Sequence, residues 1–142
     1  TSGCRFAAHV AFRAAPTLNF HINMSLTLLL RCNDLSTTRS FYRDVLKFHV
    51  TDTAEDTLTA DCFGARLVFT ASDLWQSTPF CSGTIYFEVE DLETLYASVT
   101  GNPNISWALQ DMPYGSREFG IKDCNGYFLA FRQKKSDGEP HD

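Results

Sequence analysis

Residues 28–35 read LLLRCNDL and residues 85–92 read IYFEVEDL, so one pattern occurs twice in this chain. Each copy begins with alternating apolar residues, which indicate a strand, and ends in Asp-Leu. Asp34 and Asp91 stand where an aspartate can cap a helix by accepting hydrogen bonds from its first free N–H groups. A repeated strand with a capped helix predicts two copies of one supersecondary unit.

Helical spacing follows each of these aspartates. Apolar residues recur at intervals of three and four over residues 35–46 and over residues 92–99, so we expect an amphipathic helix in each place. The tetrapeptides DCFG at 61–64 and DCNG at 123–126 then lie between alternating runs. Each supplies a glycine for the positive backbone angle φ of a tight hairpin. Each copy therefore reads as a β-α-β-β-β module.

The two modules predict an α+β fold with a curved, mixed but mainly antiparallel sheet and helices on its outer face. One alternating set of strand residues is apolar throughout and should be buried beneath the helices. Its members are Leu28, Leu30, Leu67, Phe69, Ile85, Phe87, Val89, Leu129 and Phe131. The opposite set mixes aromatic and charged residues, so it forms either solvated surface or, as we expect, the lining of a ligand groove.

The domain organisation follows from these modules and from the ends of the chain. We expect a leader at 1–23, a single domain at 24–133 with modules at about 24–71 and 83–133, and a polar tail at 134–142. The leader contains two arginines but no acidic residue. It reads as an upstream extension, as an arm packed on the domain or as a targeting peptide.

Composition narrows the functional classes. The chain has 142 residues, of which 44% are hydrophobic and 20% charged, as in an ordinary globular protein. A net charge of −5 argues against nucleic acid as a partner. No window approaches the about 18 consecutive apolar residues of a membrane span, so we expect no membrane partner. The five cysteines are widely spaced and lack a C-x-x-C pair, which indicates reduced thiols and a cytoplasmic protein.

Two runs resemble the vicinal oxygen chelate superfamily, which includes glyoxalase I, extradiol dioxygenases and the fosfomycin- and bleomycin-resistance proteins. Asp34-Leu35 followed by SFYRDVLKF at 40–48 is similar to the family's D-L-x-x-S-x-x-F-Y-x-x-x-L-G-F. The run YGSREFGIKDCNG at 114–126 resembles the Y-G-x-R-E-F-x-x-x-D-P-x-G of bleomycin-resistance-type proteins. Lys47 replaces the usual glycine and Cys124 the usual proline, and neither change removes a hairpin glycine.

Metal-dependent members of that superfamily carry their ligands on the first and last strands of each module. The resemblance maps these positions onto Thr27, Val68, Thr84 and Ala130. A divalent ion needs converging imidazole, carboxylate or thiolate donors, and these four residues supply none. We therefore expect no metal, no cofactor and no catalytic residue.

Aromatic residues and one carboxylate are the candidate ligand-binding groups. They are Trp75, Tyr86, Glu88, Trp107 and Phe128. Aromatic rings beside a sheet can stack on flat or cationic ligands, although both tryptophans could equally pack against the partner module or a partner subunit. Glu88 could neutralise a cationic ligand, or it could pair with Arg31 or Arg132 across the sheet.

The resemblance implies a non-catalytic, metal-independent protein that binds a small drug-like, aromatic or cationic molecule, as bleomycin-resistance proteins do in antibiotic resistance. It also implies a homodimer, because an open sheet edge and an uncovered face invite a second chain. Two alternatives stay open. One is a metal-dependent glyoxalase, dioxygenase or transferase-type enzyme of the same superfamily, and the other is a structural dimer module without a small ligand.

Overall fold

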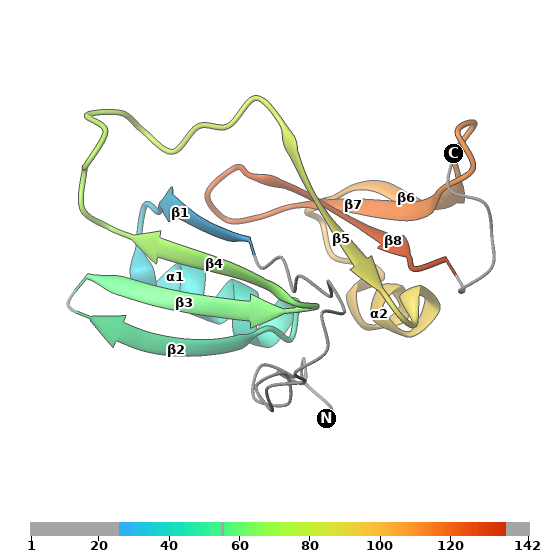
Figure 1. The fold of residues 1–142 in the computed structure, drawn as a ribbon, viewed down its shortest axis with the longest axis horizontal. Helices are drawn as coiled ribbons and strands as arrows, with labels where there is room; N and C mark the ends of the chain where they lie inside the picture. The colour runs from blue at the N-terminus through green and yellow to red at the C-terminus, as the bar shows by residue number, and fades with distance from the viewer. Residues whose placement is uncertain (1–25, 55, 136–142) are drawn as a thin grey trace, which may run out of the picture. The chain divides into compact units, whose positions relative to one another are not determined.

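The computed structural model describes residues 26–54 and 56–135, which divide after Pro79 into two compact units. The first unit contains β1 (Thr27–Arg31), α1 (Leu35–Ser40), the π-helix η1 (Phe41–Val45), β2 (His49–Ala54), β3 (Thr57–Cys62) and β4 (Ala65–Thr70) (Figure 1). The second contains β5 (Thr84–Val89), α2 (Leu92–Val99), β6 (Ile105–Asp111), β7 (Arg117–Lys122) and β8 (Phe128–Gln133). The expected leader and all but the first two residues of the expected tail lie outside the described residues.

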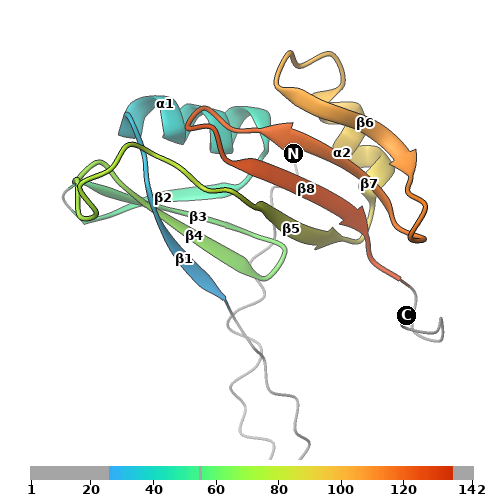
Figure 2. The same ribbon diagram turned by 90° about the horizontal axis from the view of Figure 1, so that it is seen from above.

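Each unit builds one four-stranded sheet, with strand orders β1-β4-β3-β2 and β5-β8-β7-β6. In both sheets the first strand of the module pairs in parallel with its last strand, and the other pairs are antiparallel. Each helix lies against one face of the sheet of its own unit (Figure 2). The predicted α+β class and the two β-α-β-β-β modules are therefore confirmed.

Both predicted helix caps are present. The Thr37 N–H donates to Asp34 Oδ2 at 2.7 Å, and the Thr94 N–H donates to Asp91 Oδ1 at 3.2 Å. The threonine hydroxyls donate to the same carboxylates, and these hydrogen bonds, together with those from the N–H groups, lower the pKa of both aspartates. Each aspartate thus satisfies N–H groups that the first helical turn leaves without a carbonyl partner.

The first helix covers residues 35–45 of the predicted 35–46, and its second half is a π-helix. The Leu46 N–H donates to the carbonyl of Phe41, five residues earlier, at 3.1 Å. The wider turn accompanies the burial of the adjacent Phe41 and Tyr42. Tyr42 packs on Phe69 of β4 with ring centroids 4.8 Å apart. The period-3.6 pattern located this helix and did not reveal the change of pitch.

Lys47 follows the helix with φ +62°, a left-handed conformation that favours glycine. The family motif has glycine here, so the departure noted in the sequence carries a steric cost. We expect Lys47→Gly to raise the free energy of unfolding by about 0.5–1 kcal/mol, because the relief of strain exceeds the added entropy of the unfolded chain. Urea denaturation measures the change. The exposed Lys135, which has no positive φ, provides the control Lys135→Gly, and a decrease at position 47 contradicts the prediction.

The two predicted hairpin turns are confirmed by their glycines, with φ +74° at Gly64 and +90° at Gly126. Cys32 and Cys81 carry free thiols, whereas Cys62 is disulfide-bonded. The expectation of uniformly reduced cysteines is therefore wrong at Cys62, because a bridge depends on how the fold brings two cysteines together and not on their spacing. Within residues 26–54 and 56–135 no helix is long and apolar enough to cross a membrane.

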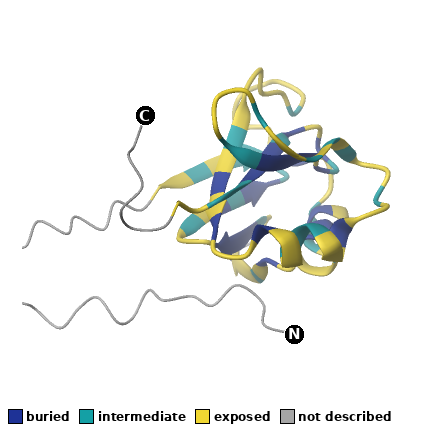
Figure 3. Ribbon diagram, turned by 90° about the vertical axis from the view of Figure 1, so that its right-hand side faces the viewer, coloured by how far each residue is buried: buried dark blue, intermediate teal, exposed yellow. Residues whose placement is uncertain are grey.

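The core of the second unit is an aromatic cluster beneath α2. Phe131 stacks on Phe87 and Phe119, with ring centroids 5.1 and 5.3 Å apart, and Tyr96 of α2 packs on Phe119 at 5.0 Å. Phe119 and Phe131 are fully buried. Figure 3 shows buried residues gathered in the strands and exposed ones in the loops. Of the nine apolar strand residues that the sequence assigned to the helix side, six are buried, and Leu28, Leu30 and Ile85 are half-buried.

Candidate functional site

Four of the five predicted binding residues lie on one face of the β5-β8-β7-β6 sheet, opposite the face that packs on α2. They are Tyr86, Glu88, Trp107 and Phe128. We call this face the open face. A row of cross-strand neighbours crosses it, formed by Tyr86, Ala130, Gly120 and Trp107. Two large aromatic residues therefore stand at the ends of a row whose middle positions are small.

Trp107 lies flat against the backbone of Gly120. A Cβ atom built on Gly120 would lie 2.4 Å from Cη2 and Cζ3 of the indole ring, so only glycine leaves room for the ring here. The indole Nε1 is buried and has no hydrogen-bond partner in the described part of the chain. The ring thus packs on its own sheet while the residue stays partly exposed on the open face.

Glu88 is already paired. The Arg132 Nη2 donates to Glu88 Oε1 at 3.0 Å, and the Arg132 guanidinium also lies 5.4 Å from the centroid of the Tyr86 ring. Arg31 belongs to the first unit, where it pairs with Asp73 at 2.6 Å. Of the two cross-sheet partners considered for Glu88, the structure selects Arg132. A cationic ligand would have to compete with this arginine.

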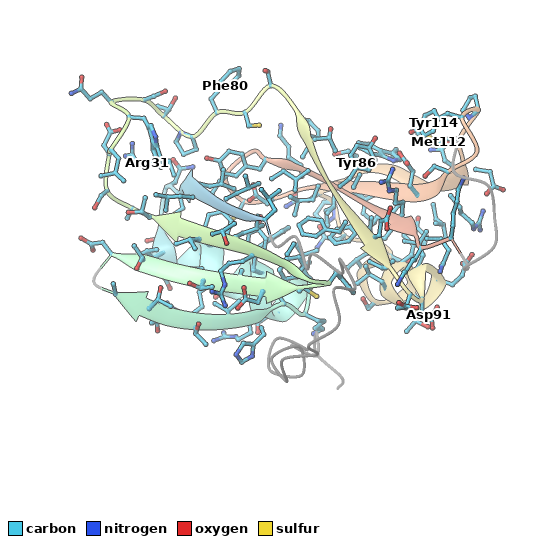
Figure 4. All side chains as sticks on the ribbon, viewed as in Figure 1. Arg31, Phe80, Tyr86, Asp91, Met112 and Tyr114 are labelled. Atoms are coloured by element: carbon cyan, nitrogen blue, oxygen red, sulfur yellow. The ribbon has the colours of Figure 1, made fainter. Side chains whose placement is uncertain are left out.

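Glu118 is a second carboxylate on the open face, and the sequence analysis did not include it among the candidate binding groups. It lies opposite Arg132 in the register and is only 1% exposed. The Tyr114 hydroxyl donates to Glu118 Oε1 at 2.8 Å, and the Ser116 hydroxyl donates to Oε2 at 2.8 Å. The Tyr86 hydroxyl approaches Oε1 at 3.5 Å. Figure 4 shows Tyr86 on β5 and Tyr114 beside the turn between β6 and β7.

These contacts influence the chemistry of Tyr114. Its hydrogen bond to Glu118 raises the pKa of the phenol far above the usual range, because the bond favours the protonated phenol beside a negative carboxylate. Tyr114 is therefore a hydrogen-bond donor to Glu118 at neutral pH. The spacing Tyr-x-Ser-x-Glu over 114–118 was the one available sequence signal, since alternation places Ser116 and Glu118 on one side. Arg117 points the other way and pairs with Glu93 of α2 at 2.9 Å.

Comparisons with known proteins give the family. Residues 21–131 match the model of the Glyoxalase/Bleomycin resistance protein/Dioxygenase superfamily. The chain belongs to this superfamily. No curated protein matches it.

Solved structures show the same superfamily fold at low sequence identity. A glyoxalase/bleomycin resistance protein/dioxygenase from Alicyclobacillus acidocaldarius is 22% identical, with a TM-score of 0.65 over 81% of this chain and 94% of its own. TioX from Micromonospora sp. ML1 is 17% identical, with a TM-score of 0.65 over 78% and 98%. A virulence protein from Salmonella typhimurium is 18% identical, with a TM-score of 0.60 over 77% and 94%. At sequence identities of 17–22%, the similarity to these structures shows the fold alone.

The residues that map onto the metal positions of this superfamily do not suit a metal. They are Thr27 on β1, Val68 on β4, Thr84 on β5 and Ala130 on β8. Two hydroxyls and two hydrocarbon side chains do not form the donor set of a divalent ion. Among the residues that the structure describes, no group of three or more His, Cys, Asp or Glu side chains gathers elsewhere. We therefore derive no chemical step through a metal.

Trp75, the fifth predicted residue, belongs to the first unit. It lies in the segment after β4, is 48% exposed, and precedes Gln76, whose φ is +53°. Arg31 anchors this segment, because its Nη1 donates to the Ser77 carbonyl at 2.7 Å as well as pairing with Asp73. The four residues of the open face belong to the second unit, and the role of Trp75 in binding stays a prediction.

Proposed function

We propose that this chain is a non-catalytic, metal-independent binding protein of the bleomycin-resistance type. Its open face would capture a small aromatic or cationic molecule. The observation that carries this proposal is the row of aromatic residues beside two carboxylates on a sheet face that no helix of its own unit covers. Tyr86 is 46% exposed there, although a tyrosine ring gains most when it is covered.

The energy of a ring–cation contact can be compared with the free energy that capture by this face requires. A cation over an aromatic ring contributes about 0.5–2 kcal/mol, and a micromolar dissociation constant corresponds to about 8 kcal/mol in total. Ring contacts alone therefore do not suffice, and apolar burial with hydrogen bonds must supply the rest. The net charge of −5 favours cationic ligands and makes their binding weaker as salt screens the attraction.

Tryptophan fluorescence tests the proposal directly. We expect bleomycin or an aromatic cationic dye to quench the emission saturably at micromolar concentration. Trp75→Phe and Trp107→Phe identify the responding ring, and we expect Trp107 to respond. Tyr86→Ala should weaken binding by about 2- to 30-fold, the loss of one ring contact.

Two outcomes would contradict the proposed function. One is unchanged fluorescence at near-millimolar concentrations of both ligand classes. The other is about one tightly held zinc, nickel, iron or manganese ion per chain in elemental analysis, together with an enzymatic activity that chelation abolishes. That second result would favour the metal-dependent enzymes of the superfamily.

A further inference from the structure

Glu118 is a buried carboxylate without a cation of its own. It forms no ion pair with any arginine or lysine in the described residues, since the neighbouring Arg132 binds Glu88 instead. Its hydrogen-bond partners are the hydroxyls of Tyr114, Ser116 and, at a longer distance, Tyr86. Hydroxyl donors stabilise a buried carboxylate only in part, because they do not neutralise its charge.

The direction of these hydrogen bonds decides what the phenols present to a ligand. An ionised carboxylate only accepts hydrogen bonds, so the hydroxyls of Tyr114 and Ser116 turn their protons toward Glu118, and the Tyr86 hydroxyl also points its proton into this cluster. A phenol has one such proton, and the remaining lone pairs can only accept. Tyr86 and Tyr114 are 46% and 60% exposed, so a ligand can reach their side chains. The pair therefore presents acceptors to the open face and no donors.

Charge on the open face points the same way. Its ionisable groups are Glu88, Arg132, Glu118, Tyr86, Tyr114 and Lys122. Glu88 and Arg132 form an ion pair, and the Lys122 Nζ lies 5.3 Å from the centroid of the Phe128 ring. Glu118 forms no ion pair among the described residues, and hydroxyl groups are its hydrogen-bond partners. Acceptor oxygens beside this carboxylate favour a cation that can donate a hydrogen bond.

We propose that Glu118 orients the hydroxyls of Tyr86 and Tyr114 so that the open face selects ligands with a protonated amine, an N–H-bearing cation, over ligands with a quaternary ammonium. This inference rests on the proposed function and names its ligand class. Aromatic stacking and cation–π attraction accept both kinds of cation. The phenol oxygens distinguish them, because a quaternary nitrogen has no hydrogen to donate.

Two matched probes test the selection. Naphthylmethyl-dimethylamine is protonated at neutral pH, and naphthylmethyl-trimethylammonium has the same ring and charge but no N–H. We expect the protonated amine to bind at least about 10-fold more tightly, the effect of one hydrogen bond to a charged group. Equal affinities would overturn this inference and leave the proposed function standing. If neither probe nor bleomycin binds, this inference and the proposed function are both wrong.

Substitutions of Tyr114 and Glu118 test whether these two residues cause the selection. Tyr114→Phe and Glu118→Gln should bring the affinity ratio of the two probes toward one while the quaternary probe still binds. Glu90→Gln is the matched control, because Glu90 is an exposed glutamate of the same unit, paired with Lys134 at 3.2 Å, and should leave the ratio unchanged. Circular dichroism checks folding. If Glu118→Gln does not fold, Tyr114→Phe decides, and an unchanged ratio in that variant overturns the inference.

Discussion

Phe131→Ala is expected to lower the free energy of unfolding by about 3–5 kcal/mol. Phe131 is fully buried in β8, and its ring stacks on Phe87 and Phe119. Truncation removes the burial of the ring and leaves a cavity between rings that belong to neighbouring strands and cannot close around it. A loss of this size is a large part of the stability of a small protein.

Urea denaturation followed by far-ultraviolet circular dichroism measures this loss. Phe80 provides the matched control because its ring is 79% exposed, so Phe80→Ala should change the free energy of unfolding by no more than about 0.5 kcal/mol. A change below about 1 kcal/mol for Phe131→Ala would show that the aromatic cluster does not form the core of this unit. Neighbouring residues of β8 face the open face, so ligand binding should weaken together with stability.

Gly120→Ala is expected to lower the free energy of unfolding by about 1–3 kcal/mol and to move Trp107 away from the sheet. The added methyl group would lie 2.4 Å from the indole ring, closer than any real contact. The strand backbone of Gly120 is held by neighbours on both sides, so the ring must give way. The indole then loses its packing surface, and the open face loses its shape at that end.

The emission spectrum of Trp107 reports this movement when Trp75 is replaced by phenylalanine in both proteins. We expect a red shift with Gly120→Ala, as the ring becomes exposed to water. Gly83→Ala is the control, because its added methyl group would meet only the Cys81 Sγ at 3.8 Å and φ there is not positive. That change should be neutral or stabilise by up to about 1 kcal/mol. An unchanged spectrum and stability for Gly120→Ala would contradict the packing seen here.

The sequence predicted the parts of the fold that depend on near neighbours. Each helix cap joins an aspartate to a residue three positions later, and Gly126 acts within its own turn. The alternation of apolar residues also identified the more buried side of β4, β5 and β8, because the pleat has a period of two. The change from α-helical to π-helical pitch in the first helix was not predicted. The π-turn at Phe41 accompanies burial of its side chain and of Tyr42, which packs on Phe69 of β4, and no local pattern shows this packing.

The candidate site depended on pairing between distant strands. Alternation placed Tyr86, Glu88 and Phe128 on one face, and this was correct. The partner of Glu88 was open between Arg31 and Arg132, because the choice depends on which strand pairs with β5 and in which register. The contact between Trp107 and Gly120 likewise depends on the register of β6 on β7. No spacing rule specifies these distances.

The sequence by itself therefore determined two β-α-β-β-β modules, their superfamily and the absence of metal donors at the mapped positions, since motif, periodicity and residue chemistry are properties of the chain. Only the tertiary structure decided that Glu118 is buried beneath hydroxyl donors while Glu88 is neutralised by Arg132. Burial and charge pairing depend on side chains from strands and turns up to 44 residues apart. The fold brings these groups together by backbone pairing, to which the charged groups themselves contribute little.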